Sequence, residues 1–340
     1  MLYGAILSLP TLIFCGILLF RSAVIERRQI ERDTVDVVRS LAADIDSDLI
    51  ATTTILRALA TSPALSRGDI PMFERQMRAA VEPGVFELLL ANQNGQQLIN
   101  TRLAIGDALP KLNSVNWQTA LSDKKPIVSD LFLGATARRF ILNISMPVYQ
   151  EGRPAYVLIA AFAPERVLDI LQRQALTREW SLGVSDRQGR IIARSNQHER
   201  FVGQILRDDL RRGSDQHKEA VVWATTNLLG EPVLRTTVRS KVSGWLIAAT
   251  VPIGVANAPL YQSWRVLGAL GACSLLASAI LAHLFGRKAA EPIVALAESV
   301  RTLGQTGQRP DVRRTLCRHQ LLSRISRDRC RAPAPPPDAH

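Results

Sequence analysis

The chain has 340 residues, of which 47% are hydrophobic and 21% are charged, and its formal net charge is +12. The hydrophobic fraction is ample for a buried core, which excludes a wholly disordered chain. Half of the excess positive charge lies in the last 54 residues, whereas residues 21–265 hold 31 basic and 25 acidic residues spread thinly. Because this distribution leaves no dense basic surface in the main block, we do not expect a nucleic-acid partner.

Two long apolar runs, Leu2–Phe20 and Val266–Phe285, contain no Lys, Arg, Asp or Glu. A helix needs about 20 apolar residues to cross the hydrocarbon core of a bilayer. We therefore predict transmembrane helices at residues 1–20 and 264–286, with the lipid bilayer as a partner. The first run lacks the basic start and the small-residue cleavage site of a secretory signal peptide, which favours an uncleaved anchor.

The charges after the second run predict the orientation of the chain. Basic residues begin at Arg287 and Lys288, and such residues gather on the cytoplasmic side of a span. We therefore predict a two-pass protein of the bacterial inner membrane, with both termini cytoplasmic and Arg21–Arg265 periplasmic. None of the 4 cysteines lies in that block, so a large periplasmic domain would be held by its core and not by disulfides.

A helical repeat without Gly or Pro extends from Ser22 to Thr61. Its apolar residues recur at close to the helical period, and Ser62-Pro63 ends the pattern. Because the repeat continues directly from the first span, it predicts a stalk helix over residues 21–62. The stalk would pack along a domain or against its twin in a parallel homodimer.

Short hairpins are indicated at two places 94 residues apart. The turn Asn92-Gln93-Asn94-Gly95 separates two apolar runs, and Asp186-Arg187-Gln188-Gly189 separates two more, with Gly aligned to Gly and Asp186 to Asn92. Asn-Gly between apolar runs is a strong hairpin signal. The repeat therefore predicts two modules of the same construction.

Longer hairpins repeat as well, around the turns Glu151-Gly152 and Ser243-Gly244. Together with the short hairpins they predict a membrane-distal module at 63–163 and a membrane-proximal module at 164–260. An amphipathic helix at 164–177 would join the two modules, since its apolar residues share one face.

This arrangement resembles the double Cache sensor domain of bacterial transmembrane receptors. The segments LLANQNGQQLINTR, ISMPVYQEGRPAYVLIAAF and GVSDRQGRIIARS look like the signatures of its two modules. The resemblance covers roughly Val24 to Pro259. It implies an α+β fold, with two tandem PAS-like (Cache) antiparallel-sheet modules on a long stalk helix, flanked by two transmembrane helices.

In that family the distal module usually holds a small ligand between its sheet and helices, which implies a pocket within Val85–Phe162. The resemblance suggests that a small-molecule ligand contacts Arg102, Trp117, Asp130, Arg139, Asn143 and Ser145. A solvent-exposed strand end, a wet sheet face or a core position would explain each of these residues without a ligand. We expect no metal site, no cofactor and no catalytic residue.

The amino-acid-sensing branch of this family has an R-x-W-Y segment and an Asp that closes the last strand of the distal module. This sequence has no such segment, and Phe162 stands where the Asp is expected. An ammonium group would then lack a carboxylate partner. We therefore expect a ligand other than a free amino acid.

Beyond the second span, the spacing of Ile293, Leu296, Val300 and Leu303 is that of a coiled-coil seam. Glu291-Pro292 suits the start of a helix, so residues 287–311 resemble the first part of a HAMP relay. Residues 312–340 are basic and end in a Pro-rich run, which predicts a disordered tail. Our hypothesis is that this tail is translated out of frame, and a docking tail for anionic lipid or nucleic acid is the alternative.

The sequence contains no recognisable phosphate loop, catalytic triad or zinc-protease motif. The chain as written is therefore expected not to be an enzyme. We interpret it as the extracytoplasmic ligand-sensing input module of a sensor histidine kinase in a two-component system, truncated before its kinase domains. The alternatives are the input half of a chemoreceptor or nucleotide-cyclase receptor, or a stand-alone membrane-anchored binding protein.

Overall fold

The computed structural model describes residues 2–81, 85–114, 116–174, 180–216 and 220–306. The chain forms two compact units, Leu19–Trp264 and Met1–Leu18 with Arg265–His340. Both β-sheets belong to the first unit.

A single helix, α1 (Leu2–Ala60), contains the first apolar run and the predicted stalk. Its buried residues include Val38, Leu41, Ile45 and Leu49, whose spacing of three or four places them on one face. The helix ends at Ala60, and Ser62 then caps the short helix α2 (Pro63–Ser66) by accepting a hydrogen bond from the backbone N–H of Ala64. The predicted stalk helix is thus present, with its apolar stripe packed against a domain.

The distal sheet is antiparallel and has the strand order β2-β1-β6-β5-β3, with β4 paired to β5. The predicted hairpins around Gly95 and Gly152 are both present. The strands are β1 (Glu87–Asn92), β2 (Gln97–Asn100), β3 (Ile127–Val128), β4 (Phe132–Leu133), β5 (Phe140–Gln150) and β6 (Arg153–Phe162), and the helices are α3 (Ile70–Ala79) and α4 (Asn116–Asp123).

The proximal sheet has the order β8-β7-β11-β10-β9, which repeats the distal order strand for strand when β4 is set aside. In each sheet the first strand pairs with the last strand of the module. The strands are β7 (Ser181–Ser185), β8 (Ile191–Arg194), β9 (Val222–Thr226), β10 (Pro232–Arg239) and β11 (Leu246–Pro252), and the helices are α5 (Pro164–Arg173), α6 (His198–Phe201), α7 (Asp208–Gln216) and α8 (Ile253–Ala256). The 94-residue repeat in the sequence therefore corresponds to a repeat of the topology.

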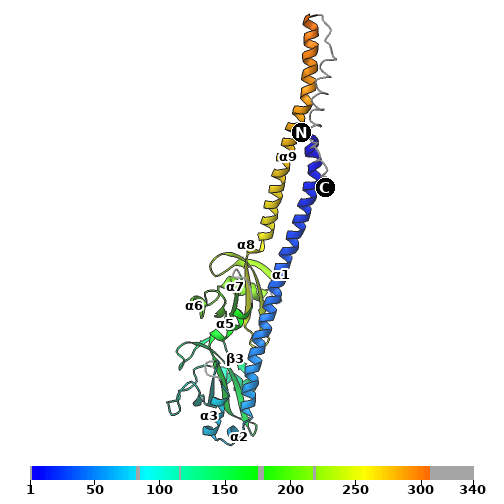
Figure 1. Ribbon diagram of the computed structural model, residues 1–340. Helices are drawn as coiled ribbons and strands as arrows, with labels where there is room; N and C mark the ends of the chain where they lie inside the picture. Colours follow the sequence, from blue (N-terminus) through cyan, green and yellow to red (C-terminus); the bar gives the residue numbers. More distant parts are fainter. Residues whose placement is uncertain (1, 82–84, 115, 175–179, 217–219, 307–340) are drawn as a thin grey trace, which may run out of the picture. The chain divides into compact units, whose positions relative to one another are not determined.

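One hydrophobic core joins α1 to both sheets, and Figure 1 shows the blue helix lying along them. The core combines residues from the helix, the distal sheet and the proximal sheet, among them Leu41, Ile45, Leu49, Leu88, Ile144, Ile247 and Ala249. Because side chains alternate across a strand, the opposite face of each sheet is left for other contacts.

The two modules meet at a polar joint. The indole Nε1 of the fully buried Trp245 donates to the Ser129 carbonyl at 3.1 Å, and the backbone N–H of Leu131 donates to Asp186 Oδ2 at 3.1 Å. Arg187 forms an ion pair with Asp130 at 2.8 Å. The joint therefore connects the loop after β3 to the turn after β7 and to the residue before β11.

The joint explains why the two repeated turns carry different residues. Asn92 Oδ1 accepts from the N–H groups of Asn94 and Gln96, and Asp186 Oδ1 does the same for Gln188 and Arg190. An amide is sufficient for the turn, but the second acceptor oxygen of Asp186 also bonds Leu131. Burial raises the pKa of the Asp186 carboxyl, so this bond is offset in part by a desolvation cost.

We expect Asp186→Asn to lower the free energy of unfolding by about 1–2 kcal/mol, because it preserves the turn but leaves the Leu131 N–H facing an NH₂ group. The reverse exchange in the distal turn, Asn92→Asp, should change stability by less than about 0.5 kcal/mol. Chemical unfolding of the full chain in detergent measures both. Equal effects of the two exchanges would show that the carboxylate has no role between the modules.

The last helix, α9, extends without interruption from Ala258 to Thr306. Within the described ranges, one segment, Ala258–Leu281, is long and apolar enough to cross a membrane. The expected start of a new helix at Glu291-Pro292 is wrong, since Pro292 lies inside α9 and removes a single N–H donor there. The predicted tail at 312–340 lies outside the described residues.

The linking helix α5 is shorter than predicted. It ends at Arg173, and Gln174 is already extended, whereas the prediction reached residue 177. Residues 175–177 lie outside the described ranges. Arg166 on this helix pairs with Asp48 of α1 at 2.8 Å, which fixes α5 against the stalk.

Candidate functional site

The distal module has a pocket on the sheet face opposite α1. Alternate residues of β5 divide between the two faces: Leu142 and Ile144 join the core with α1, whereas Ile141 and Asn143 line the pocket. The pocket measures about 500 Å³, including the part that opens to solvent. Its walls are formed by Glu87, Leu89, Gln97, Asn100, Arg102, Leu112, Asn113, Ser114, Phe132, Gly134, Ala135, Thr136, Ala137, Ile141, Asn143, Ile159 and Ala161.

Asn143 is the most buried of the predicted site residues that line this pocket, with 3% of its surface exposed. Its amide nitrogen makes a long bond of 3.4 Å to Ser114 Oγ, and its amide oxygen has no partner among the described residues. An unpaired buried acceptor costs free energy, and a ligand donor in the pocket would satisfy it.

Opposite charges meet at another part of the same pocket. Arg102 Nη2 lies 2.5 Å from Glu87 Oε1, and each side chain is partly exposed. The pair offers a cation to a ligand carboxylate and an anion to a ligand ammonium, and the guanidinium suits a bidentate contact. The pocket therefore provides recognition groups of both signs.

Of the six predicted contact residues, the structure brings Arg102 and Asn143 to the pocket. Ser145 is fully buried and follows Asn143 on the same face of β5, but it does not line the cavity, and its hydroxyl has no partner in the described structure. Trp117 packs on Val157 and Ile159 beside the pocket. These two residues lie beside the pocket but do not line it.

The other two predicted residues lie elsewhere. Asp130 forms the ion pair with Arg187 at the joint between the modules, and Arg139 is exposed in the segment before β5. Residues 134–137, between β4 and β5, line the cavity, but neither Asp130 before β4 nor Arg139 at the end of that segment is among the lining residues.

Phe162 and Glu87 change the expectation about ligand charge. Phe162 is buried on the core face of β6, with its ring 5.3 Å from the Arg166 guanidinium, so it does not face the pocket. Ala161 occupies the pocket face beside it and pairs with Glu87 across the sheet. Glu87 supplies a carboxylate that sequence reasoning missed. The available signal was an acidic residue at the start of a predicted strand, and in the structure this residue pairs with the end of the β5–β6 hairpin.

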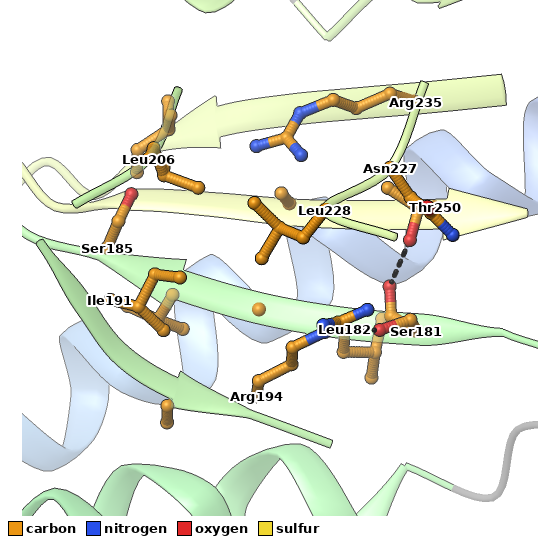
Figure 2. A pocket seen from close by; sticks show the side chains of 15 residues that line it. Ser181, Leu182, Ser185, Ile191, Arg194, Leu206, Asn227, Leu228, Arg235 and Thr250 are labelled. Atoms are coloured by element: carbon orange, nitrogen blue, oxygen red, sulfur yellow. Dashed lines mark hydrogen bonds between the residues drawn. The ribbon is translucent and has the colours of Figure 1, made fainter. Parts of the chain in front are cut away.

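The proximal module has a pocket on the corresponding face of its sheet, about 460 Å³ in volume including space open to solvent. Two of its lining residues are buried arginines, Arg194 of β8 and Arg235 of β10 (Figure 2). Sequence reasoning assigned no site here. In the sequence each arginine stands in a strand among apolar or hydroxyl neighbours, a pattern that does not by itself indicate burial.

No family model and no curated protein matches the sequence. Among solved structures, the chain is similar to the ligand-binding domain of the Campylobacter jejuni chemoreceptor Tlp3 in complex with L-valine, at a TM-score of 0.54 and 15% identity, over 72% of this chain and 98% of that one. It is also similar to the extracellular domain of a protein described as a histidine kinase, rpHK1S-Z16. The TM-score is 0.56 and the identity 13%, over 67% of this chain and 97% of that one.

A third similar structure is the ligand-binding domain of the Pseudomonas aeruginosa PAO1 amino acid chemoreceptor PctB in complex with L-Arg, at a TM-score of 0.52 and 16% identity, over 66% of this chain and 96% of that one. At such identities the likeness establishes the fold. The chain has the fold of the extracellular sensor domains of these receptors, and it spans nearly their full length.

Proposed function

We propose that this chain is the extracytoplasmic ligand-sensing input module of a transmembrane signalling receptor. The observation that carries the proposal is a complete tandem-sheet sensor fold followed directly by an apolar helix that can cross a membrane. Residues 21–265 would lie in the periplasm of a bacterium, with helices 1–20 and 264–286 in the inner membrane. The relay and stalk would act in a parallel homodimer.

The output of the parent protein is proposed to be a histidine kinase reached through a HAMP relay. The similar extracellular domain of rpHK1S-Z16 supports this choice, and the chemoreceptor domains support the alternative of a chemoreceptor output. Small shifts of the helices that flank the module would serve either output. The gene's reading frames after codon 311 distinguish the two, since each output has its own catalytic or coiled-coil sequence.

The distal pocket is the proposed ligand site. We propose a small zwitterion as the ligand, because Arg102 and Glu87 carry opposite charges at one wall and Asn143 offers an unpaired amide oxygen. The similar domains of Tlp3 and PctB were solved with L-valine and L-Arg. The sequence predicted that an ammonium group would lack a carboxylate partner in this module. Glu87 lines the pocket and is proposed to be that partner.

We expect a thermal-unfolding screen of the full chain in detergent to find a zwitterion that stabilises it. At a concentration 100 times its Kd, such a ligand adds about 2.7 kcal/mol to the free energy of unfolding. Glu87→Gln should remove the stabilisation, because the amide cannot attract an ammonium group. Glu151→Gln is the matched control, since Glu151 lies exposed in the β5–β6 turn.

Two outcomes of this screen would count against the proposed site. The first is that no small zwitterion raises the unfolding temperature of the full chain. The second is that Glu87→Gln responds to the ligand as strongly as wild type and Glu151→Gln do.

A further inference from the structure

The proximal pocket owes its space to small residues in the middle of the sheet. Gly183 of β7 pairs with Ala248 of β11 on one side and with Arg194 of β8 on the other. A Cβ built on Gly183 would find nothing closer than the Ala193 carbonyl oxygen at 3.7 Å. The backbone of Gly183 does not have a positive φ, so its lack of a side chain serves the cavity and not a turn.

Two arginines line this cavity. Arg235 is 6% exposed, and its Nε has no hydrogen-bond partner among the described residues. Arg194 is 8% exposed, donates from Nε to Ser181 Oγ at 3.1 Å, and has an unpaired Nη1. Figure 2 shows Arg235 reaching over the sheet from one side and Arg194 from the other, with Leu228 between them.

Neither arginine forms a salt bridge within the described ranges, and none of the pocket-lining residues is Asp or Glu. The carboxylates with an electrostatic influence on them are already bonded elsewhere. Asp209 accepts from Arg207 at 2.7 Å, and Glu231 accepts from the Asn227 amide at 2.8 Å. Two like charges are thus buried in one pocket without a counter-ion, an arrangement that costs free energy unless an anion joins them.

We propose that the proximal pocket is a second ligand site, which binds a small aliphatic carboxylate between Arg194 and Arg235. A carboxylate accepts up to four N–H bonds, so it can satisfy the unpaired donors of both guanidinium groups. The pocket also contains Ile191, Leu206 and Leu228, which suit a short hydrocarbon body. Without an acid in its lining, the pocket offers no anionic partner to an ammonium group, which separates this ligand from the zwitterion of the distal site.

The charge needed for this contact is present at neutral pH. Burial and the neighbouring Arg194 lower the pKa of Arg235 to about 10, which leaves the guanidinium protonated. Carboxylates are ionised above about pH 5.

One of the strands that line the site precedes the last helix in the chain. Thr250 and Ala248 line the pocket on β11, and this strand ends at Pro252, immediately before α8 and then α9. A ligand that draws β8 and β10 together would thus act on the strand that continues into the helix. The proposed distal function does not require this second site.

The test uses the full chain in detergent at constant ionic strength, with butyrate, its neutral analogue butyramide, inorganic phosphate and alanine as probes. We expect butyrate to raise the unfolding temperature and to bind in calorimetry, and butyramide and alanine to have no effect through this site. Arg235→Met and Gly183→Val should each weaken butyrate binding by at least about tenfold. Arg212→Met, which alters an exposed arginine of α7, is the matched control and should bind as wild type does.

Three results would overturn the proposal: no response to butyrate, a response to phosphate alone, or full butyrate binding in both pocket variants. Arg235→Met could weaken binding by disturbing the fold. Gly183→Val controls for this effect, since it keeps both arginines and only reduces the volume of the pocket. Glu87→Gln, which should lose the distal zwitterion, keeps the butyrate response if the sites are separate. The failure of one site is thereby distinguished from the failure of the other.

Discussion

Replacing Trp245 with alanine is expected to lower the free energy of unfolding by about 3–5 kcal/mol. Trp245 is fully buried immediately before β11 and belongs to the core shared with α1. Its indole also bonds the Ser129 carbonyl of the distal module at 3.1 Å. Alanine therefore creates a cavity and leaves a buried acceptor unpaired, and equilibrium unfolding of the full chain in detergent measures the sum.

Trp245→Phe separates these two contributions. Phenylalanine retains most of the apolar volume but cannot donate to Ser129, so the expected loss is about 1–3 kcal/mol. If phenylalanine were as costly as alanine, cavity formation would contribute nothing beyond the loss of the indole donor. If both variants unfolded like wild type, Trp245 would not be the buried joint between the modules.

Leu49→Ala in α1 should cost about 3–5 kcal/mol. Leu49 is 1% exposed and lies in the core that α1 shares with both sheets, so its loss leaves a cavity between helix and domain. The neighbouring Ile50 is 54% exposed, and Ile50→Ala should change stability by less than about 0.5 kcal/mol. The pair of variants separates burial from helix propensity, because both place alanine in the same turn.

Unfolding followed by circular dichroism in detergent measures both changes. Similar losses at the two positions would contradict the one-sided packing of α1. A large loss at Ile50 alone would mean that the opposite face of the helix is the buried one.

The hairpins were predictable because their determinants are local. Asn-Gly and Asp-x-x-Gly turns between apolar runs specify strand, turn and strand without reference to distant residues. The apolar period of residues 35–59 likewise predicts a helix and its buried face. The spacing of two such hairpins, repeated after 94 residues, was enough to indicate a repeated module.

The contacts of individual polar residues were less predictable, because they depend on where distant segments meet. Asp130 follows a strand of two residues, and only the packing of the modules brings it to Arg187. Phe162 stands where the amino-acid-sensing branch has an Asp, but β6 alternates so that Ala161 faces the pocket instead. A shift of one residue along a strand exchanges its faces, which is why such assignments are sensitive to register.

The buried arginines of the proximal module show another limit. In the sequence, Arg194 and Arg235 resemble ordinary charged residues of an exposed strand face. Their burial follows from the segments that cover this face, including the cluster of Phe201, Leu206 and Leu210. Only the assembled module shows that two charges share one cavity.

Hydrogen–deuterium exchange of the full chain, with and without the zwitterion that stabilises it most, tests the central claim most directly. Ligand contact should slow the exchange of backbone amides around the distal pocket, in β1, β2 and the segment 132–143. The result that would contradict the account is a stabilising ligand that leaves exchange in these segments unchanged.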